Sequence, residues 1–143
     1  MEIRTIKYNS EDYFKEQKLR NRVLRIPLGL NLFDENMENE ISDIHIGAFK
    51  GNILTGILIL TPVDEKTVKM RQVGVDTDYQ NLGIGTSLVQ FSETLAVDRG
   101  YKKITMHARK TAVDFYIKLG YETVGEEFTE VSIPHFKLTK NLN

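Results

Sequence analysis

Two closely spaced glycines between a strand-like and a helix-like segment constrain the fold of this chain most. Residues 68–75 read as a strand, and residues 88–97 carry apolar side chains at helical spacing. Gly83 and Gly85 lie between them, and a glycine lets a ligand approach the backbone closely. The free N–H groups and the dipole at a helix start attract anions. The segment therefore predicts a binding site for a phosphate-bearing ligand, and a diphosphate fits it best.

The rest of the chain alternates between strand and helix patterns around this loop. We predict helices at residues 10–26, 83–99 and 111–119, and strands at residues 1–7, 43–49, 53–60, 67–75, 102–107, 121–125 and 132–138. The early strands follow one another as an antiparallel meander, whereas the later ones alternate with helices. This order predicts an α+β fold, with a mixed α/β sheet covered by helices on both faces.

Composition narrows the functional class. A chain of 143 residues is expected to form one domain over residues 1–143, and a formal net charge of −1 gives no general affinity for nucleic acid or for an anionic membrane. The absence of cysteine excludes disulfides, thiolate metal sites and a cysteine nucleophile. Residues 1–7 alternate and carry charge, so we expect neither a signal peptide nor a membrane anchor there, and no apolar run is long enough to span a bilayer. A cytoplasmic protein is expected.

The spacing within the loop separates three kinds of phosphate site. A P-loop would need a Gly-Lys pair where Ser87 and Leu88 stand, and a dinucleotide fingerprint would need a third glycine at Leu88. Both patterns fail. The pattern that fits is Gln-x-x-Gly-x-Gly, from Gln80 to Gly85. It resembles the acetyl-CoA-binding motif of the GNAT acyltransferase superfamily.

A second motif carries the same resemblance. Residues 112–122 read Ala-Val-Asp-Phe-Tyr-Ile-Lys-Leu-Gly-Tyr-Glu, which is similar to the family's Ala-x-x-Phe-Tyr-x-x-Leu-Gly-Phe/Tyr signature. The order of strands and helices is also similar over most of the chain. The resemblance implies a GNAT-like fold with a twisted, mostly antiparallel sheet of six to seven strands. It also implies an N-acetyltransferase that moves an acetyl group from acetyl-CoA to a primary amine by direct transfer.

The resemblance places the coenzyme along the second half of the 67–75 strand and on the loop. Loop amides would hold the pyrophosphate, and the strand edge would pair with the pantetheine arm like an added strand. The coenzyme-binding residues expected on this basis are Val73, Gly74, Val75, Gln80, Asn81, Leu82, Gly83, Ile84, Gly85, Thr86, Ser87, Arg109, Ala112 and Phe115.

Acyl transfer from a thioester needs a proton for the leaving thiolate and a donor for the carbonyl oxygen. Tyr116 is the candidate acid, because the resemblance places the family's acidic tyrosine at this position of the motif. A phenol, with an ordinary pKa of about 10, stays protonated at neutral pH. The resemblance also implies that the backbone N–H of Val75 is the oxyanion donor. Gly74, a glycine inside a strand, predicts the bulge that would aim it.

The base that deprotonates the amine is left open between side chains and water. His107 ends a predicted strand, and Glu130 lies in the acidic segment 126–130, which also fits a solvated turn. Many members of the superfamily use a chain of water molecules instead. His107 and Glu130 are the candidate catalytic side chains beside Tyr116.

Two expectations for the acceptor conflict. Phe33, Asp34, Glu35 and Glu38, with Glu130, would form acidic walls for a cationic amine such as a polyamine, a lysine side chain or an aminoglycoside. Arg71, on a strand beside the coenzyme, would instead bind a carboxylate of an amino-acid-like acceptor, or pair with a nearby Asp or Glu of the protein itself. Phe33, Arg71 and His135 are the expected substrate-binding residues.

No metal site is expected, because His45, His107 and His135 are far apart in sequence and lack ligand spacing. Two other classes remain as alternatives: a non-catalytic acyl-CoA-binding sensor or scaffold, and a nucleotide-phosphate-binding protein, which the missing lysine and third glycine disfavour. The partners expected are a small-molecule or peptide amine and, through the last strand at 132–138, a second copy of the chain.

Overall fold

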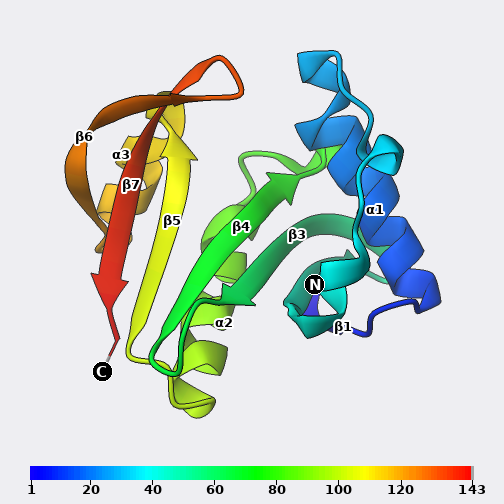
Figure 1. Cartoon of the computed structure of the whole chain (residues 1–143). Coiled ribbons are helices and arrows are strands. Elements are labelled where there is room, and N and C mark those ends of the chain that lie inside the picture. The colour runs from blue at the N-terminus through cyan, green and yellow to red at the C-terminus, as the bar shows by residue number, and fades with distance from the viewer. Residues whose placement is uncertain (143) are drawn as a thin grey trace.

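A seven-stranded mixed sheet organises the chain, which a computed structural model describes over residues 1–142 (Figure 1). The strand order is β1-β2-β3-β4-β5-β7-β6, and only the β4–β5 pair is parallel. The strands are β1 (Glu2–Ile6), β2 (Ile44–Lys50), β3 (Ile53–Pro62), β4 (Thr67–Val75), β5 (Lys103–Arg109), β6 (Glu122–Glu130) and β7 (Ile133–Asn141). The predicted mixed, mostly antiparallel sheet is confirmed.

Three helices cover the two faces of this sheet: α1 (Glu11–Leu24), α2 (Ile84–Asp98) and α3 (Val113–Lys118). Neighbouring residues of β3 show the layering. Ile57 packs in the cluster that contains Tyr13 and Leu19 of α1, whereas Gly56 faces α2. A Cβ at Gly56 would lie 2.9 Å from a methyl of Leu88, so this glycine lets α2 approach the sheet. No helix within residues 1–142 is long and apolar enough to cross a membrane.

Short 3-10 turns fill the segment between α1 and β2. They are η1 (Ile26–Leu28), η2 (Leu32–Asp34) and η3 (Glu38–Ser42). Two more connect later elements, η4 (Thr77–Tyr79) and η5 (Lys110–Ala112). Ser10 caps α1, because its side chain accepts a hydrogen bond from the N–H of Tyr13.

The prediction for the last two strands was too short. β6 does not end at residue 125 but continues to Glu130, and its register with β7 shifts between Val124 and Phe128. Gly125, with φ 77°, begins this irregular stretch, which explains why the local sequence resembles a turn. The hairpin instead turns at Val131 and Ser132, both with positive φ.

The buried face of α1 carries charges as well as apolar residues. Tyr13, Glu16 and Arg20 of α1, Glu40 of η3 and His45 of β2 form a hydrogen-bonded set, which we call the α1 network. Arg20 binds both oxygens of Glu40, at 2.8 and 2.7 Å, and Glu16 at 3.1 Å. The hydroxyl of Tyr13 donates to Glu40 at 2.6 Å. Each member is 7% exposed or less, so these contacts anchor α1 and η3 to the sheet without help from water.

His45 is doubly protonated in this network. Its Nε2 lies 2.8 Å from the carbonyl oxygen of Glu40 and its Nδ1 lies 3.0 Å from both carboxylate oxygens of Glu16. A carbonyl and a carboxylate only accept, so both ring nitrogens must donate. Burial disfavours the charge, but the hydrogen bond to Glu16 and the nearby carboxylates outweigh it and hold the pKa of His45 above its usual value.

This geometry also decides whether the cluster is a metal site. The ligand atoms of Glu16, Glu40 and His45 lie within 4.8 Å of one another, a spacing that a metal ion could use. However, both nitrogens of His45 donate and leave no lone pair, and the guanidinium of Arg20 already binds both carboxylates. The set is a charge-balanced ion-pair network of two cations and two anions.

Stability should therefore depend on pH through His45. A raised pKa in the folded state stabilises the protein fully below the unfolded value of about 6.5, and this stabilisation is lost as the pH rises through the folded value. We expect the free energy of unfolding to fall above pH 6.5, by at most about 1.4 kcal/mol per pH unit from this one group. Urea unfolding across pH 6–9 measures it. The His45→Gln variant should lack this decline, and an unchanged decline would assign it to another group.

Candidate acyltransferase site

The glycine loop opens α2 as the sequence predicts. Asn81 and Gly83 adopt left-handed conformations, with φ 63° and 80°, and α2 begins at Ile84 without a side-chain cap. The amide groups of its first turn therefore have no partner within the helix. Gln80 has a structural role here, because its Nε2 donates to the carbonyl oxygen of Val75 at 3.2 Å. This bond ties the loop to the end of β4.

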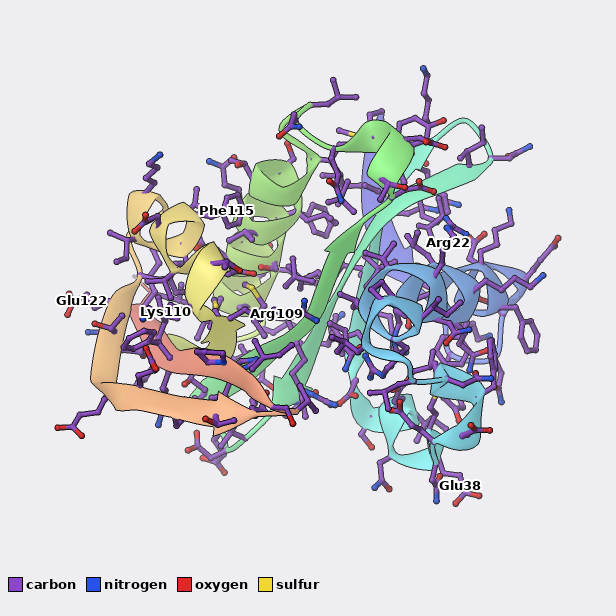
Figure 2. All side chains as sticks on the ribbon, turned by 90° about the horizontal axis from the view of Figure 1, so that it is seen from above. Arg22, Glu38, Arg109, Lys110, Phe115 and Glu122 are labelled. Carbon is purple, nitrogen blue, oxygen red and sulfur yellow. The ribbon has the colours of Figure 1, made fainter. Side chains whose placement is uncertain are left out.

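The second motif packs against the first. A Cβ built on Gly85 would lie 3.4 Å from the ring of Phe115, so the α3 side chain closes over the start of α2. Seen from above, Phe115 points from α3 toward α2 (Figure 2). The two sequence motifs therefore form one continuous surface on the same face of the sheet.

A gap in strand pairing separates the halves of the sheet. β4 and β5 pair from Thr67 and Lys103 to Met70 and Met106, whereas β4 continues to Val75 and β5 to Arg109 (Figure 1). Beyond Met70 and Met106, the facing edges of β4 and β5 are not paired with each other. A parallel strand edge with free backbone groups is the kind of surface that binds an extended amide-containing chain. The pantetheine arm of coenzyme A has that chemistry.

The bulge in β4 does not lie where the sequence suggested. Gly74 pairs with Ile57 of β3, and the next pair is Arg71 with Ile59, so the extra residue belongs to Gln72–Val73. Gln72 has φ 56°, whereas Gly74 is not in the left-handed region. The bulge therefore does not require a glycine at position 74, where a Cβ would make only an ordinary contact with Leu24 at 3.4 Å. A strained non-glycine residue produces it instead.

A cavity of about 490 Å³ lies at this gap and gathers all three predicted catalytic residues. Its walls come from the end of α1, from β4 and β5, from the start of the α3 motif and from the β6–β7 hairpin. They include, among the predicted site residues, Arg71, Val73, His107, Arg109, Ala112, Tyr116, Glu130 and His135. Gly74 and Val75 are not in its lining, and the Val75 amide stays a prediction.

His107, Glu130 and His135 meet in this cavity, although the sequence suggested that the histidines lie apart. Nδ1 of His107 lies 3.0 Å from one oxygen of Glu130, and Nε2 of His135 lies 3.6 Å from the other. Nδ1 of His135 lies 2.8 Å from the carbonyl oxygen of Ile133. The pairing of Arg109 with His135 brings the ends of β5 and β7 together and creates this contact.

Glu130 fixes the tautomer of His107. Burial alone would raise the pKa of Glu130, but the hydrogen bond from His107 and the charges of His107, His135 and Lys69 hold it below its usual value. The ionised carboxylate can only accept, so Nδ1 of His107 carries the proton. In the neutral imidazole, Nε2 then has the lone pair. His107 can therefore act as a base, with Glu130 as its orienting partner.

Tyr116 lines the same cavity and is only 6% exposed. Burial raises the pKa of its phenol to about 12. Within residues 1–142 its hydroxyl has no hydrogen-bond partner, while the ring packs edge-on against Phe115 and Tyr121. The Tyr116 hydroxyl is therefore a protonated hydrogen-bond donor in the apolar part of the cavity wall.

The predicted acidic wall does not assemble. Phe33, Asp34 and Glu38 are absent from the cavity lining, and Glu38 lies at the far outer side of η3 in Figure 2. Glu35 does line the cavity, but both of its oxygens bind Arg25, at 2.6 and 3.2 Å. Arg25 was missed in the sequence, because its pairing depends on how the turns after α1 fold back.

Similarity to known proteins agrees with this geometry. A family model described as an acetyltransferase (GNAT) domain matches residues 28–142. A Bacillus subtilis (strain 168) protein named as an acetyltransferase is 32% identical over 96 residues, which are 67% of this chain and 65% of that protein. The match thus spans slightly less than two thirds of that relative's length.

Solved structures share the fold at low sequence identity. An N-acetyltransferase structure from Lactobacillus plantarum superposes with a TM-score of 0.87 and 20% identity, covering 100% of both chains. An aminoglycoside 6′-N-acetyltransferase complexed with coenzyme A gives a TM-score of 0.81 and 19% identity, covering 99% of this chain and 97% of that one. The family model covers most of the chain, and both motifs are present. The chain therefore belongs to the GNAT acetyltransferase family.

Proposed function

We propose that this protein is an acetyl-CoA-dependent N-acetyltransferase that acetylates a primary amine by direct transfer. The observation that carries the proposal is the convergence of Tyr116 and His107 on one cavity at the open edge of β4. The loop from Gln80 to Ser87 would bind the pyrophosphate, and the edge at Val73–Val75 would bind the pantetheine arm. Both supports are backbone surfaces, which suit a ligand rich in phosphate and amide groups.

Each chemical step has a residue to perform it. The amine nitrogen attacks the thioester carbon, the C–N bond forms and the C–S bond breaks. Nε2 of His107 accepts the proton lost by the amine, and the carboxylate of Glu130 stabilises the imidazolium that results. The hydroxyl of Tyr116 donates its proton to the departing sulfur, and the Val75 amide is the proposed donor to the carbonyl oxygen.

The function is tested by thiol release from acetyl-CoA with a broad panel of amines. Turnover with an amine supports the transferase. The second candidate, a non-catalytic acyl-CoA sensor, keeps the loop and the open β4 edge but needs no base. Binding of acetyl-CoA without turnover on any amine would favour that candidate. Stabilisation by ATP or NAD but not by coenzyme A would contradict both.

The His107→Gln variant should lower kcat by about 10²- to 10⁴-fold, the usual contribution of a positioned base. Glu130→Gln should lower kcat less, because a neutral amide still accepts from Nδ1 but no longer balances the imidazolium charge. Steady-state kinetics from pH 6 to 10 measure both effects. The matched control is Lys137→Gln, opposite His107 on β7 and outside the cavity lining. An unchanged kcat in both variants would indicate that a chain of water molecules, and not His107, removes the proton from the amine.

A further inference from the structure

The charged groups of the cavity wall indicate what kind of amine it accepts. Three arginines, Arg25, Arg71 and Arg109, line the cavity together with only two carboxylates, Glu35 and Glu130. The chain as a whole has a net charge of −1, so this excess of cations is local. The inference below rests on the proposed transferase function and specifies its acceptor.

Both carboxylates are already committed to partners in the cavity wall. Glu35 binds Arg25 through two hydrogen bonds, which is the strong geometry for this pair. Glu130 is 3.0 Å from His107 and holds that ring for catalysis. A cationic substrate would have to compete with these partners, so the wall offers no free anion.

The remaining two arginines have donors to spare. Within residues 1–142, no carboxylate lies within 4.0 Å of the Arg109 guanidinium. Arg71 uses one nitrogen for its polar contacts in this part of the chain, a hydrogen bond to Thr61 at 3.3 Å and an ion pair with Asp43 at 3.9 Å. A guanidinium has five N–H donors in a planar fork that matches a carboxylate. Most of the donors of Arg71 and Arg109 are therefore available to a ligand.

These two arginines and the proposed base lie on the same face of the sheet. Ile104, Met106 and Ala108 of β5 are buried in the core shared with α2, so His107 and Arg109 lie on the opposite face. On β4, Met70 points to that core, and its neighbour Arg71 points away from it. Figure 2 shows Arg109 between the two halves of the sheet.

We propose that the acceptor is an amino-acid-like molecule, in which a carboxylate stands near the amine that is acetylated. Arg71 and Arg109 bind the carboxylate from the two sides of the gap, and this contact presents the amine to Nε2 of His107. The 490 Å³ cavity suits a small molecule of this kind. Arg109 then serves the acceptor, whereas the family resemblance assigned it to the coenzyme.

Matched acceptors provide the test. Thiol release is measured with amino acids, with their carboxamides and with the corresponding decarboxylated amines. The wild type should favour the acids over the amides by about tenfold or more in kcat/KM, as expected for charge-assisted hydrogen bonds. Arg71→Gln and Arg109→Gln should each lower kcat/KM for the acids by about 10- to 100-fold and that for the amides by a much smaller factor, because a neutral amide oxygen gains less from a guanidinium than a carboxylate does. Arg22→Gln, outside the cavity, is the control and should leave the ratio unchanged.

The outcomes separate this inference from the function on which it rests. Amides or decarboxylated amines that react as well as the acids would overturn the carboxylate contact while supporting the transferase. A raised KM for acetyl-CoA in Arg109→Gln, with an unchanged acid-to-amide ratio, would return Arg109 to the coenzyme and contradict the inference. No thiol release with any acceptor, despite binding of acetyl-CoA, would overturn the transferase itself.

Discussion

Substitution of Arg20 by methionine should lower the free energy of unfolding by about 3–5 kcal/mol, the cost of breaking a buried ion pair by removing one partner. Arg20 is 1% exposed and is the cation that binds both Glu16 and Glu40. Methionine fills a similar volume but leaves two buried carboxylates with His45 as their only cation. Urea unfolding at pH 7 measures the loss.

A control on the same helix isolates burial as the cause. Arg22 also pairs with a carboxylate, Asp76, but its side chain is 54% exposed. Arg22→Met should therefore cost less than about 1 kcal/mol, as exposed pairs do. Equal losses in the two variants would contradict the argument from burial. If Arg20→Met does not fold, Glu40→Gln, which keeps the shape and removes one charge, should show an intermediate loss.

The second large effect is expected at Tyr116. Tyr116→Phe should lower kcat by about 10²- to 10⁴-fold, the usual range for a positioned acid, with little change in the affinity for acetyl-CoA. The substitution removes only the hydroxyl, and within residues 1–142 that hydroxyl supports no other contact. Single-turnover kinetics and coenzyme titration separate the two quantities.

The raised pKa of Tyr116 adds a pH signature. Its pKa of about 12 lies well above that of a thiol, about 8.5, so the phenol does not give up its proton before the sulfur begins to leave. The wild-type kcat should accordingly show no loss from tyrosine ionisation up to about pH 10. A descending limb near pH 10 that disappears in Tyr116→Phe would contradict the burial effect.

Tyr121→Phe is the matched control. Tyr121 is also buried and packs against Tyr116, but its hydroxyl donates to Glu93 and it does not line the cavity. Its substitution should reduce stability and leave kcat close to wild type. A loss of turnover equal to that of Tyr116→Phe would assign the effect to ring packing in the core and remove Tyr116 from the mechanism.

Local patterns allowed the order of elements to be predicted from the sequence. Ser10 before an acidic first turn starts α1, and Gly83 starts α2, because caps and left-handed positions are decided by a few adjacent residues. The same holds for the two motifs, which lie within continuous segments. The resemblance that these two motifs carry implied the GNAT fold and pointed to Tyr116, which lines the cavity.

Long-range contacts explain what the sequence could not provide. The burial of Glu16 and Arg20 on α1 depends on Glu40 and His45, which come from elements 20 or more residues away in sequence. The contact of Glu130 with His107 likewise depends on the register between β5 and β7. The bulge was predicted in the correct strand, β4, but at the wrong residue. A glutamine gives no sign in the sequence that its backbone is left-handed, as that of Gln72 is.

The unpaired edges of β4 and β5 also present backbone groups with which another chain can pair. An exposed strand edge invites any extended peptide, and proteins usually protect such edges at the rim of a sheet with charges or bulges. Here the open edge lies in the middle of the sheet, between Met70 and Val75 on one side and Met106 and Arg109 on the other. A bound molecule that pairs with this edge would occupy the place where another chain could begin to aggregate.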